Sequence, residues 1–471
     1  MASIVVTGAG MAGLTTAMLL ADDGHQVVVL ERDPAVPPPP AEAWGTWKRR
    51  GVVQFRLAHI LQPRFRKEAE MALPRVITAL EAAGALRLNF VMDAPTELTG
   101  GTRPGDGDFE VVTARRPVVE SVIAACADDT PGVTVRRGVA IAGVTTGSKA
   151  RAGVPHVTGI RTEAGEEIGA DLVVDAAGRR SPLPGWLEAA GGRRPDEELE
   201  DSGFIYYGRH FRSADGSLPP IMGPLLQNYG SISVLTLPAD NGTWGIVMVG
   251  SAADSALRGL RDTDSWNAVV RSLPFAAHWL DGEPLEDGIQ MMAKIEDRHR
   301  AFMIDGQPVA TGVAAVADAW ACTNPSLGRG ISMGFLHSLA LRDTLRQTPG
   351  DDPVALMGAW SDVTEETVEP WYRATVAFDR HRLAEIDAEI RGEPYRPGDP
   401  VWDIGQGLRF AAGQDPDCLR AFLSIVGVLE SAEEAVARPG VLEKVVALGD
   451  GWRHAARFGP SRRELLAMVS P

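Results

Sequence analysis

Three glycines near the N-terminus have the spacing of a turn that binds phosphate groups. Gly8, Gly10 and Gly13 match the pattern G-x-G-x-x-G. In this pattern the first glycine permits a tight turn, the second lets a pyrophosphate reach the backbone, and the third lets the next helix pack closely. The N-terminus of that helix offers unpaired N–H groups and a partial positive charge. The spacing therefore indicates a dinucleotide site.

An acidic side chain follows at the distance that such a site needs. Glu31 lies about twenty residues beyond the glycines, where its carboxylate can accept hydrogen bonds from both hydroxyls of an adenosine ribose. A carboxylate suits the free 2′-hydroxyl of FAD or NAD better than the 2′-phosphate of NADP. FAD and NAD both remain open at this point.

The residues around this turn predict the elements that hold it. Residues 3–6 are a short β-branched run, typical of a strand buried on both faces. Residues 14–20 have the spacing of a helix that ends at Gly24. Residues 27–30 predict a second buried strand, with Glu31 at its carboxyl end. The sequence therefore predicts the first strand–helix–strand unit of an α/β fold.

Two later segments also pass from a buried strand into a turn rich in glycine. One covers residues 171–178, and the other covers residues 310–330 and includes Asp318. The carboxylate of Asp318 could bind a ribityl hydroxyl. A long helix predicted over 331–346 begins directly after this turn, so its N-terminus could face the electron-rich carbonyl edge of a flavin. A single mononucleotide unit would need only the first of these elements.

Composition argues against several classes of function. The chain has 471 residues, of which 45% are hydrophobic and 23% charged, as expected for a soluble protein of two or three domains. The formal net charge of −16 argues against nucleic acid or an anionic membrane as the main partner. Three cysteines without C-x-x-C spacing fit reduced thiols, and we expect no metal site. We also expect a cytoplasmic protein, because the sequence shows neither a signal peptide nor an apolar run long enough to span a membrane.

The pattern changes after residue 200. Strands alternating with turn residues over 203–300 predict an antiparallel sheet with a helix near 266–280. We expect four segments: a first part of a nucleotide-binding domain over 1–200, an inserted substrate domain over 201–300, a return to the first domain over 301–390, and a helical region over 391–471.

On these motifs the chain resembles the FAD-dependent monooxygenases of the aromatic-hydroxylase and squalene-epoxidase class, over about residues 1–380. The glycine turn with Glu31, Arg116 followed by Glu120, and Asp318 followed by Pro-x-x-Gly-x-Gly carry the resemblance. It implies an α/β fold with a glutathione-reductase-like FAD-binding Rossmann domain, an inserted antiparallel-sheet α+β substrate domain and a helical C-terminal region. It also implies FAD as cofactor and O₂ as co-substrate. The implied cofactor-binding residues are Gly8, Gly10, Met11, Ala12, Gly13, Glu31, Arg32, Arg50, Arg116, Asp318, Pro325, Gly328, Gly330, Ile331 and Ser332.

The chain departs from the family pattern at three places. Ala317 stands where the family has glycine, Ala321 stands where it has histidine, and residues 176–178 read Ala-Ala-Gly instead of Ala-Asp-Gly. The last motif is associated with both FAD and NAD(P)H contact in the family. Electrons could therefore come from NAD(P)H directly or through a partner flavin reductase.

Within that class the sequence is most similar to bacterial polyketide (polyether) epoxidases, on residues 50–54, His59 and residues 322–330. This resemblance implies a flavin C4a-hydroperoxide that epoxidises C=C bonds of a large apolar polyketide or terpenoid. Such electrophilic oxygen transfer needs positioning and a dry pocket but no obligatory protein base, so no catalytic residue is assigned. The candidate pocket residues, for which core packing is the alternative, are Tyr206, Tyr207, Trp244, Met291 and Met292.

Other functions stay open. An aromatic hydroxylase would benefit from a base that helps to ionise a phenol. A flavin-dependent halogenase needs a W-x-W-x-I-P motif, and residues 242–247 lack its second tryptophan and its proline. A reductase of isoprenoid double bonds or a flavin-binding scaffold without activity are further alternatives. The basic side chains of residues 44–58, namely Lys48, Arg49, Arg50 and Arg56, predict either a solvated loop or contacts to an anionic ligand, and His59 is expected to be a packed histidine.

Overall fold

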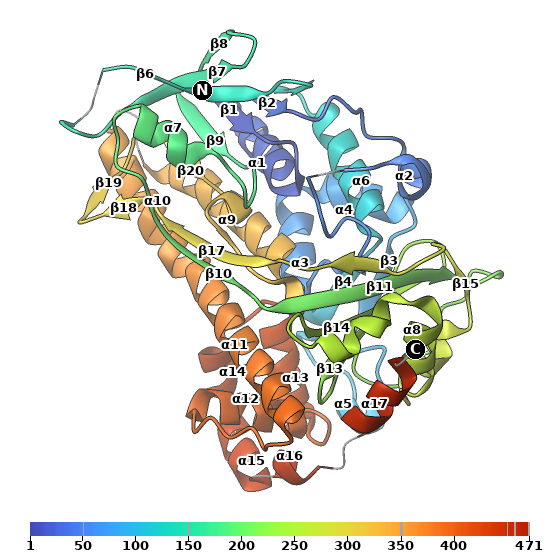
Figure 1. Ribbon diagram of the computed structural model, residues 1–471. Helices are drawn as coiled ribbons and strands as arrows, with labels where there is room; N and C mark the ends of the chain where they lie inside the picture. Colours follow the sequence, from blue (N-terminus) through green and yellow to red (C-terminus); the bar gives the residue numbers. More distant parts are fainter. Residues whose placement is uncertain (50, 149–150, 349–351, 450, 456–457, 470–471) are drawn as a thin grey trace.

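A five-stranded parallel sheet forms the centre of the upper lobe in the computed structural model, which describes residues 1–49, 51–148, 151–348, 352–449, 451–455 and 458–469 (Figure 1). The strand order is β20-β9-β1-β2-β5. The strands span Ser3–Thr7 (β1), Gln26–Glu31 (β2), Val133–Arg137 (β5), Leu172–Asp175 (β9) and Val313–Ala315 (β20). Chain segments more than 300 residues apart in the sequence thus join one sheet, as the three predicted strand-to-turn segments require.

Helices cover one face of this sheet and a small antiparallel sheet covers the other. Helix α1 (Met11–Asp22) packs on α6 (Arg116–Asp128) and α9 (Gly330–Gln347), and their apolar side chains share one core with the sheet. On the opposite face lie β6 (Ile141–Thr146), β7 (Val157–Thr162) and β8 (Glu167–Gly169), with α7 (Leu183–Ala189). Strands β7 and β8 form a hairpin that the following strand does not extend. Residues 167–169 pair with β7, but residues 172–175 leave the hairpin to pair with β1.

A second, six-stranded sheet forms the sheet domain. Its order is β12-β13-β14-β11-β15, and β16 pairs with β11. The strands span Phe204–Arg212 (β11), Leu226–Tyr229 (β12), Ile232–Pro238 (β13), Thr243–Ser251 (β14), Glu283–Pro284 (β15) and Gln290–Met292 (β16). Helix α8 (Thr263–Arg271) and the C-terminal α17 (Arg462–Val469) pack on one face of this sheet. The predicted helix over 266–280 is shorter than expected, since α8 ends at Arg271 and a separate 3₁₀ turn covers Ala277–Leu280.

A narrow three-stranded sheet connects the two larger sheets. Strand β17 (Glu296–Ala301) pairs with β10 (Asp196–Asp201) on one side and with β21 (Ala321–Cys322) on the other. Because β21 comes directly before the predicted flavin turn, this sheet ties that turn to the sheet domain.

The segment between β2 and β5 folds over the edge of the glycine turn. It contains α2 (Pro40–Thr46), α3 (Pro63–Ala72), α4 (Pro74–Ala82), β3 (Leu86–Asn89), α5 (Thr96–Thr99) and β4 (Glu110–Thr113). Leu73 separates α3 from α4, because proline at position 74 restricts the conformation of the residue before it. A further short hairpin joins β18 (Met303–Ile304) to β19 (Gln307–Pro308).

The C-terminal quarter of the chain, from residue 353 onward, is helical in its described residues, and most of its helices form the lower lobe in Figure 1. It begins with α10 (Pro353–Thr367) and α11 (Glu369–Arg391). A group of shorter helices follows: α12 (Pro400–Ala411), α13 (Pro416–Val426), α14 (Ala432–Val436), α15 (Val441–Leu448) and α16 (Gly451–His454). Among the described helices, none is long and apolar enough to cross a membrane.

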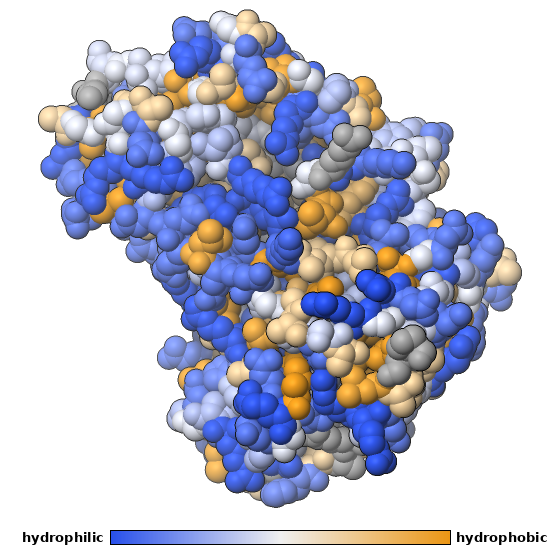
Figure 2. All heavy atoms as spheres, in the orientation of Figure 1, coloured by the Kyte–Doolittle hydropathy of each residue, from blue (hydrophilic) through white to orange (hydrophobic). Residues whose placement is uncertain are grey.

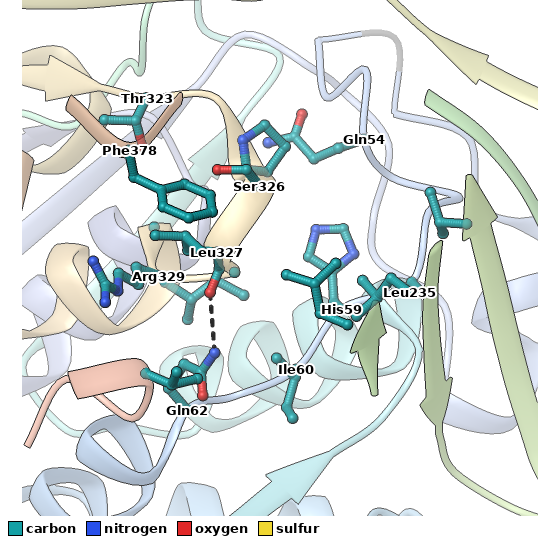
Figure 3. Close-up of a pocket in the computed structure, with 18 of the residues that line it drawn as sticks. Gln54, His59, Ile60, Gln62, Leu235, Thr323, Ser326, Leu327, Arg329 and Phe378 are labelled. Atoms are coloured by element: carbon teal, nitrogen blue, oxygen red, sulfur yellow. Dashed lines mark hydrogen bonds between the residues drawn. The ribbon is translucent and has the colours of Figure 1, made fainter. Parts of the chain in front are cut away.

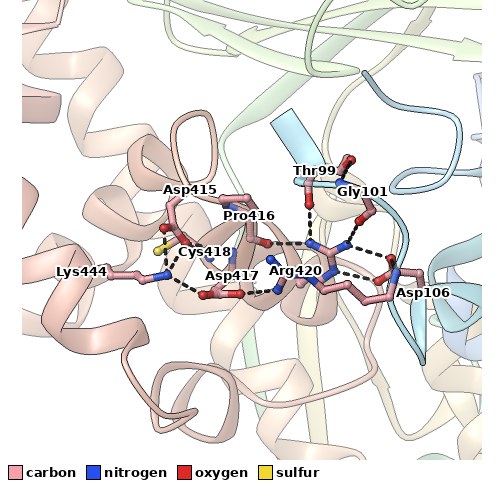
Figure 4. A network of polar contacts seen from close by, with 10 residues as sticks. Thr99, Gly101, Asp106, Asp415, Pro416, Asp417, Cys418, Arg420 and Lys444 are labelled. Carbon is pink, nitrogen blue, oxygen red and sulfur yellow. Dashed lines mark hydrogen bonds and ion pairs between the residues drawn. The ribbon is translucent and has the colours of Figure 1, made fainter. Parts of the chain in front are cut away.

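A buried polar network attaches these helices to the N-terminal half (Figure 4). The guanidinium group of Arg420 on α13 donates to both carboxylate oxygens of Asp106, at 2.7 and 2.8 Å. It also donates to the carbonyl oxygens of Thr99 and Gly101, each at 2.9 Å. The shorter C-terminal helices are thus held against the loop of residues 99–106.

Candidate cofactor and substrate site

One continuous cavity of about 2860 Å³ runs from the glycine turn to the C-terminal helices. Gly8, Gly10 and Glu31 line its first part, and Asp318 and the turn before α9 line its middle. Beyond them the walls come from the sheet domain and from α11, α12 and α13. The three strand-to-turn segments predicted from the sequence therefore meet at one cavity.

The three glycines of the turn have different surroundings. Gly8 has φ +97°, and a Cβ on it would lie 2.7 Å from the carbonyl oxygen of Ala176. A Cβ on Gly13 would lie 2.0 Å from the carbonyl oxygen of Gly8. Gly10 lines the cavity, and a Cβ on it would meet no atom within 4 Å. Gly8 and Gly13 are therefore required by packing, whereas Gly10 leaves open space for a ligand.

Glu31 lies at the end of β2, facing this turn. Its carboxylate accepts hydrogen bonds from the backbone N–H groups of Ala9, at 3.0 Å, and Asp33, at 2.9 Å. Arg49 donates to the same carboxylate at 3.3 Å. Two backbone N–H groups thus fix the orientation of the carboxylate at the predicted ribose position.

Arg49 belongs to the basic segment for which the sequence left both a solvated loop and contacts to an anionic ligand open, and the structure places it at the site. Its guanidinium group bridges Glu31 and the buried Glu120. Arg116 donates to Glu120 from the other side at 2.6 Å. Burial would raise the pKa of Glu120, but the two arginines outweigh it and hold the pKa below the usual range. Arg50 lies outside the described residues, and Arg32 lines the cavity with an exposed side chain.

His59 joins the same cluster as a neutral side chain. Its Nε2 lies 3.0 Å from Nη1 of Arg116, and its Nδ1 lies 2.8 Å from the carbonyl oxygen of Leu57. This places the proton on Nδ1, so that Nε2 accepts from the guanidinium group. Burial and the charge of Arg116 lower the pKa of His59 to about 3. The imidazole therefore positions Arg116 and has no nitrogen free to act as a base.

Asp318 lies in a 3₁₀ turn directly after β20. It lines the cavity, and among the described residues its carboxylate has no hydrogen-bond partner. Burial raises the pKa of Asp318, and Arg116 and Arg179 partly oppose that shift. A carboxylate withdrawn from bulk solvent without a partner is costly unless a ligand supplies donors. This position suits a bound hydroxyl group.

The residue before Asp318 explains one departure from the family pattern. Ala317 has φ +51°, a left-handed conformation that favours glycine. Its N–H group donates to Nδ1 of His337 at 3.0 Å, and Nε2 of that histidine lies 3.1 Å from Oγ1 of Thr364. Burial lowers the pKa of His337 to about 3, so it stays a neutral acceptor. The spacing of the motif does not reveal this hydrogen bond, although His337 lies only seven residues beyond Gly330.

The turn before α9 forms the middle of the cavity wall (Figure 3). Pro325, Gly328, Gly330 and Ile331 line the cavity, and no side chain caps the N-terminus of α9. Nε2 of Gln62 donates to the carbonyl oxygen of Leu327 at 3.1 Å and holds the turn in place. The N–H groups at the start of α9 remain available to an electron-rich ligand.

Ser332 lies behind this wall, apart from the other predicted cofactor residues. It does not line the cavity, because helical geometry turns its side chain into the core, where it is buried. Met11 and Ala12 at the start of α1 do line the cavity. Some of the predicted cofactor residues, such as Met11 and Ala12, therefore face the cavity. Others, such as Ser332, are buried behind its wall.

Strand alternation separates the predicted pocket residues. Tyr206 and Met292 line the cavity. Tyr207 and Trp244 instead point to the opposite face of the sheet, into the core beneath α8 and α17, and Met291 is 56% exposed at the surface. Successive side chains of a strand point to opposite faces, so Tyr206 and Tyr207 cannot both reach the cavity. The predictions for Tyr207, Trp244 and Met291 were therefore wrong.

The sequence did not predict the wall formed by the C-terminal helices. Apolar side chains from α11, α12 and α13 line the cavity beyond the flavin turn, among them Phe378, Trp402, Leu419 and Phe422. The opposite wall comes from the sheet domain, with Leu235, Leu237 and Val247. Their only sequence signal is helical or alternating periodicity, which does not tell a cavity wall from a core.

The sheet order, the glycine turn and the acid at the end of β2 define an α/β protein with a Rossmann-like nucleotide-binding domain. The family model for an NAD(P)-binding Rossmann-like domain matches residues 6–36. Protein Rv3254 of Mycobacterium tuberculosis is 27% identical over 452 residues, which cover 91% of this chain and 90% of that protein.

Several solved structures share the fold. One is PqsL from Pseudomonas aeruginosa, described as a probable FAD-dependent monooxygenase, with TM-score 0.58 and 17% identity over 82% of this chain and 96% of that one. OxyS, the anhydrotetracycline hydroxylase from Streptomyces rimosus, has TM-score 0.56 and 18% identity over 91% of this chain and 76% of that one. A flavoprotein/dehydrogenase from Cytophaga hutchinsonii has TM-score 0.61 and 16% identity over 96% and 99%. The predicted fold class is confirmed.

Proposed function

We propose that this protein is an FAD-dependent monooxygenase that acts on a large apolar molecule. One observation carries the proposal: the cavity that begins at the glycine turn continues past Asp318 into an apolar chamber. Its volume of about 2860 Å³ exceeds that of an ordinary single-ligand pocket, about 300–1,000 Å³. There is room for a dinucleotide and a large second molecule in contact with it.

The residues of the cavity fit FAD. Gly10 leaves space for the pyrophosphate, and the fixed carboxylate of Glu31 suits an adenosine ribose. The unpartnered carboxylate of Asp318 suits a ribityl hydroxyl, and the uncapped N-terminus of α9 suits the carbonyl edge of the flavin ring. Arg49 and Arg116 bring positive charge close to the phosphate position.

The proposed reaction is the insertion of one oxygen atom from O₂ into the substrate, while the other leaves as water. Bound flavin, once reduced by NAD(P)H directly or through a flavin reductase, would supply the two electrons and the oxygen chemistry. The chain supplies a pocket that excludes water and holds the substrate, with Leu235, Leu327 and Phe378 among its apolar walls (Figure 3). The solved neighbours PqsL and OxyS, described as a monooxygenase and a hydroxylase, support this class.

We further propose epoxidation of a C=C bond in a polyketide or terpenoid as the preferred reaction. This choice agrees with an apolar cavity in which His59 is neutral and has both ring nitrogens engaged. Aromatic hydroxylation is the second candidate, and the hydroxylase activity of OxyS favours it. A halogenase or an isoprenoid-type reductase is a weaker alternative. Electrons would come from NAD(P)H directly or through a flavin reductase.

The proposal also divides the chain by role. Residues 1–200 and 301–390 would hold FAD, residues 201–300 would form the substrate domain, and residues 391–471 would close the cavity as a helical region. We also propose that the protein acts in the cytoplasm.

Labelled dioxygen tests the proposal. The purified protein is loaded with FAD, reduced anaerobically with dithionite, and mixed with retinol as a polyene probe and isotopically labelled O₂. The expected product contains one labelled oxygen atom as an epoxide. A hydroxylated product without an epoxide would favour the second candidate. Reduction of the probe without O₂ would contradict the proposal and point to a reductase.

A further inference from the structure

The far end of the cavity forms an outer chamber built from the C-terminal helices. We use this name for the part lined by Trp402, Gln406, Arg409, Phe422, Trp452 and Phe458. The residues of α12 that line it recur at helical spacing, so one face of this helix forms a continuous wall. Most of the wall is apolar or aromatic, but it includes one arginine.

Arg409 faces the chamber without a protein partner. It lines the cavity and keeps accessible surface there, yet no hydrogen bond or ion pair of its guanidinium group occurs among the described residues. Burial lowers the pKa of Arg409, and the charge of Arg382 adds to this effect, while Glu385 opposes it. Arg409 is exposed, so an anionic ligand could reach its guanidinium group without displacing a partner among the described residues.

The neighbouring charges are already paired. Glu385 accepts a hydrogen bond from Arg382 at 2.6 Å, and Arg382 also donates to the carbonyl oxygens of Gly230 and Ile232. Deeper in the cavity, Arg329 donates to the carbonyl oxygen of Ile425 at 2.8 Å. Arg382 and Glu385 thus pair with each other, whereas Arg409 has no hydrogen bond or ion pair among the described residues.

The mouth of this chamber is apolar. Ile221, Met222, Val401 and Phe458 line the cavity and are exposed, between 47% and 76%. Figure 2 shows hydrophobic residues gathered where the C-terminal helices meet the sheet domain. Val401 and Arg409 lie eight residues apart on α12, which places the cation about 12 Å along the helix from the mouth.

We propose that the outer chamber binds a large conjugated or polycyclic molecule with one anionic oxygen, a carboxylate or an ionised enol, and that Arg409 pairs with that oxygen. The inference rests on the proposed function, because it names the substrate class for the same cavity. The apolar rim and the aromatic walls take the body of the molecule, and the guanidinium group orients it by its charged end. The opposite end of the molecule then reaches toward the turn before α9.

Two matched probes test the inference without turnover. Retinoate and retinol have the same apolar body, but only retinoate is an anion. Each is titrated into the full-length protein in its oxidised, FAD-loaded form, and quenching of tryptophan fluorescence reports binding, because Trp402 and Trp452 line the chamber. We expect the protein to prefer retinoate, and Arg409→Gln to weaken retinoate binding by about 10- to 100-fold while changing retinol binding less than about twofold.

Two control variants make the result specific. Arg409→Lys keeps the charge and should recover part of the retinoate preference. Arg271→Gln alters an exposed arginine outside the cavity, so this variant should bind retinoate as the parent protein does. Equal affinity of the parent protein for both probes, failure to bind either, or an equal loss in a control variant would overturn the inference.

The flavin content of the same samples separates this inference from the proposed function. Retinoate preference that depends on Arg409 in a protein unable to retain FAD would support the chamber and contradict the monooxygenase. A normal FAD content without any retinoate preference would support the proposed cofactor and contradict the binding of an anion in the outer chamber.

Discussion

Arg116 donates from Nε to Oε1 of Glu120 at 2.6 Å, one turn further along α6. The same carboxylate is held by Arg49 from a different segment, and both arginines line the cavity. A single buried carboxylate thus joins the loop after β2 to α6 at the predicted phosphate position. The negative charge of Glu120 offsets the positive charges of Arg49 and Arg116. A bound dinucleotide would also come close to these two arginines.

The first prediction concerns this carboxylate. Glu120→Gln leaves two buried arginines with one negative charge fewer, so we expect the free energy of unfolding to fall by about 3 kcal/mol. Saturating FAD should reduce that loss, since its phosphates would replace the missing charge. Urea unfolding with and without FAD measures both effects. The exposed Glu188→Gln serves as the control and should leave the unfolding midpoint unchanged.

The second prediction separates folding from cofactor binding at the glycine turn. A Cβ on Gly10 meets no atom within 4 Å, so Gly10→Ala should fold with the same unfolding midpoint. The methyl group would occupy the space of the pyrophosphate, and we expect FAD affinity to fall at least about tenfold, measured by flavin fluorescence titration. Gly45→Ala, which also has open space but lies outside the cavity, should retain full affinity. Unchanged FAD binding in Gly10→Ala would place the cofactor elsewhere.

The third prediction is a pH dependence set by Asp379. Burial raises the pKa of this carboxyl to about 7, from about 3.9 in the unfolded chain. The folded state therefore binds the proton more tightly, and the contribution of Asp379 to stability is fully present below about pH 4 and is lost as the pH rises toward 7.

Asp379→Asn removes this titration and keeps the shape of the side chain. We expect the variant to be more stable than the parent protein at about pH 8, with a smaller difference at about pH 5. Urea midpoints at the two pH values provide the measurement. A difference that is the same at both values would show that Asp379 is not protonated in the folded protein.

The fourth prediction concerns the attachment of the C-terminal helices (Figure 4). Arg420→Met removes the bidentate partner of Asp106 and leaves that carboxylate buried, so we expect a loss of about 3 kcal/mol in the free energy of unfolding. Limited proteolysis should also cleave between residues 391 and 450 sooner than in the parent protein. Arg391→Met, at an exposed ion pair, is the matched control. Equal proteolysis of both variants would argue against a role of Arg420 in holding these helices.

The sequence predicted the parts of the site that depend on local backbone conformation. The turn at Gly8 and Gly13 could be predicted because steric limits within a few residues require glycine there. Asp318 could be predicted because it comes directly after a buried strand. The pattern of residues 204–211 predicts a strand but not which of its faces meets the cavity, so Tyr206 and Tyr207 could not be told apart. Arg49 and Arg409 reach the cavity only through tertiary packing, which no local pattern records.

The flavin content of the purified protein tests the central claim most directly. The protein is isolated, incubated with excess FAD and NAD, desalted and denatured by heat, and the released nucleotide is identified by mass spectrometry. We predict about one FAD per chain and no retained NAD. A chain that retains NAD instead, or no nucleotide at all, would contradict the assignment of this cavity to FAD.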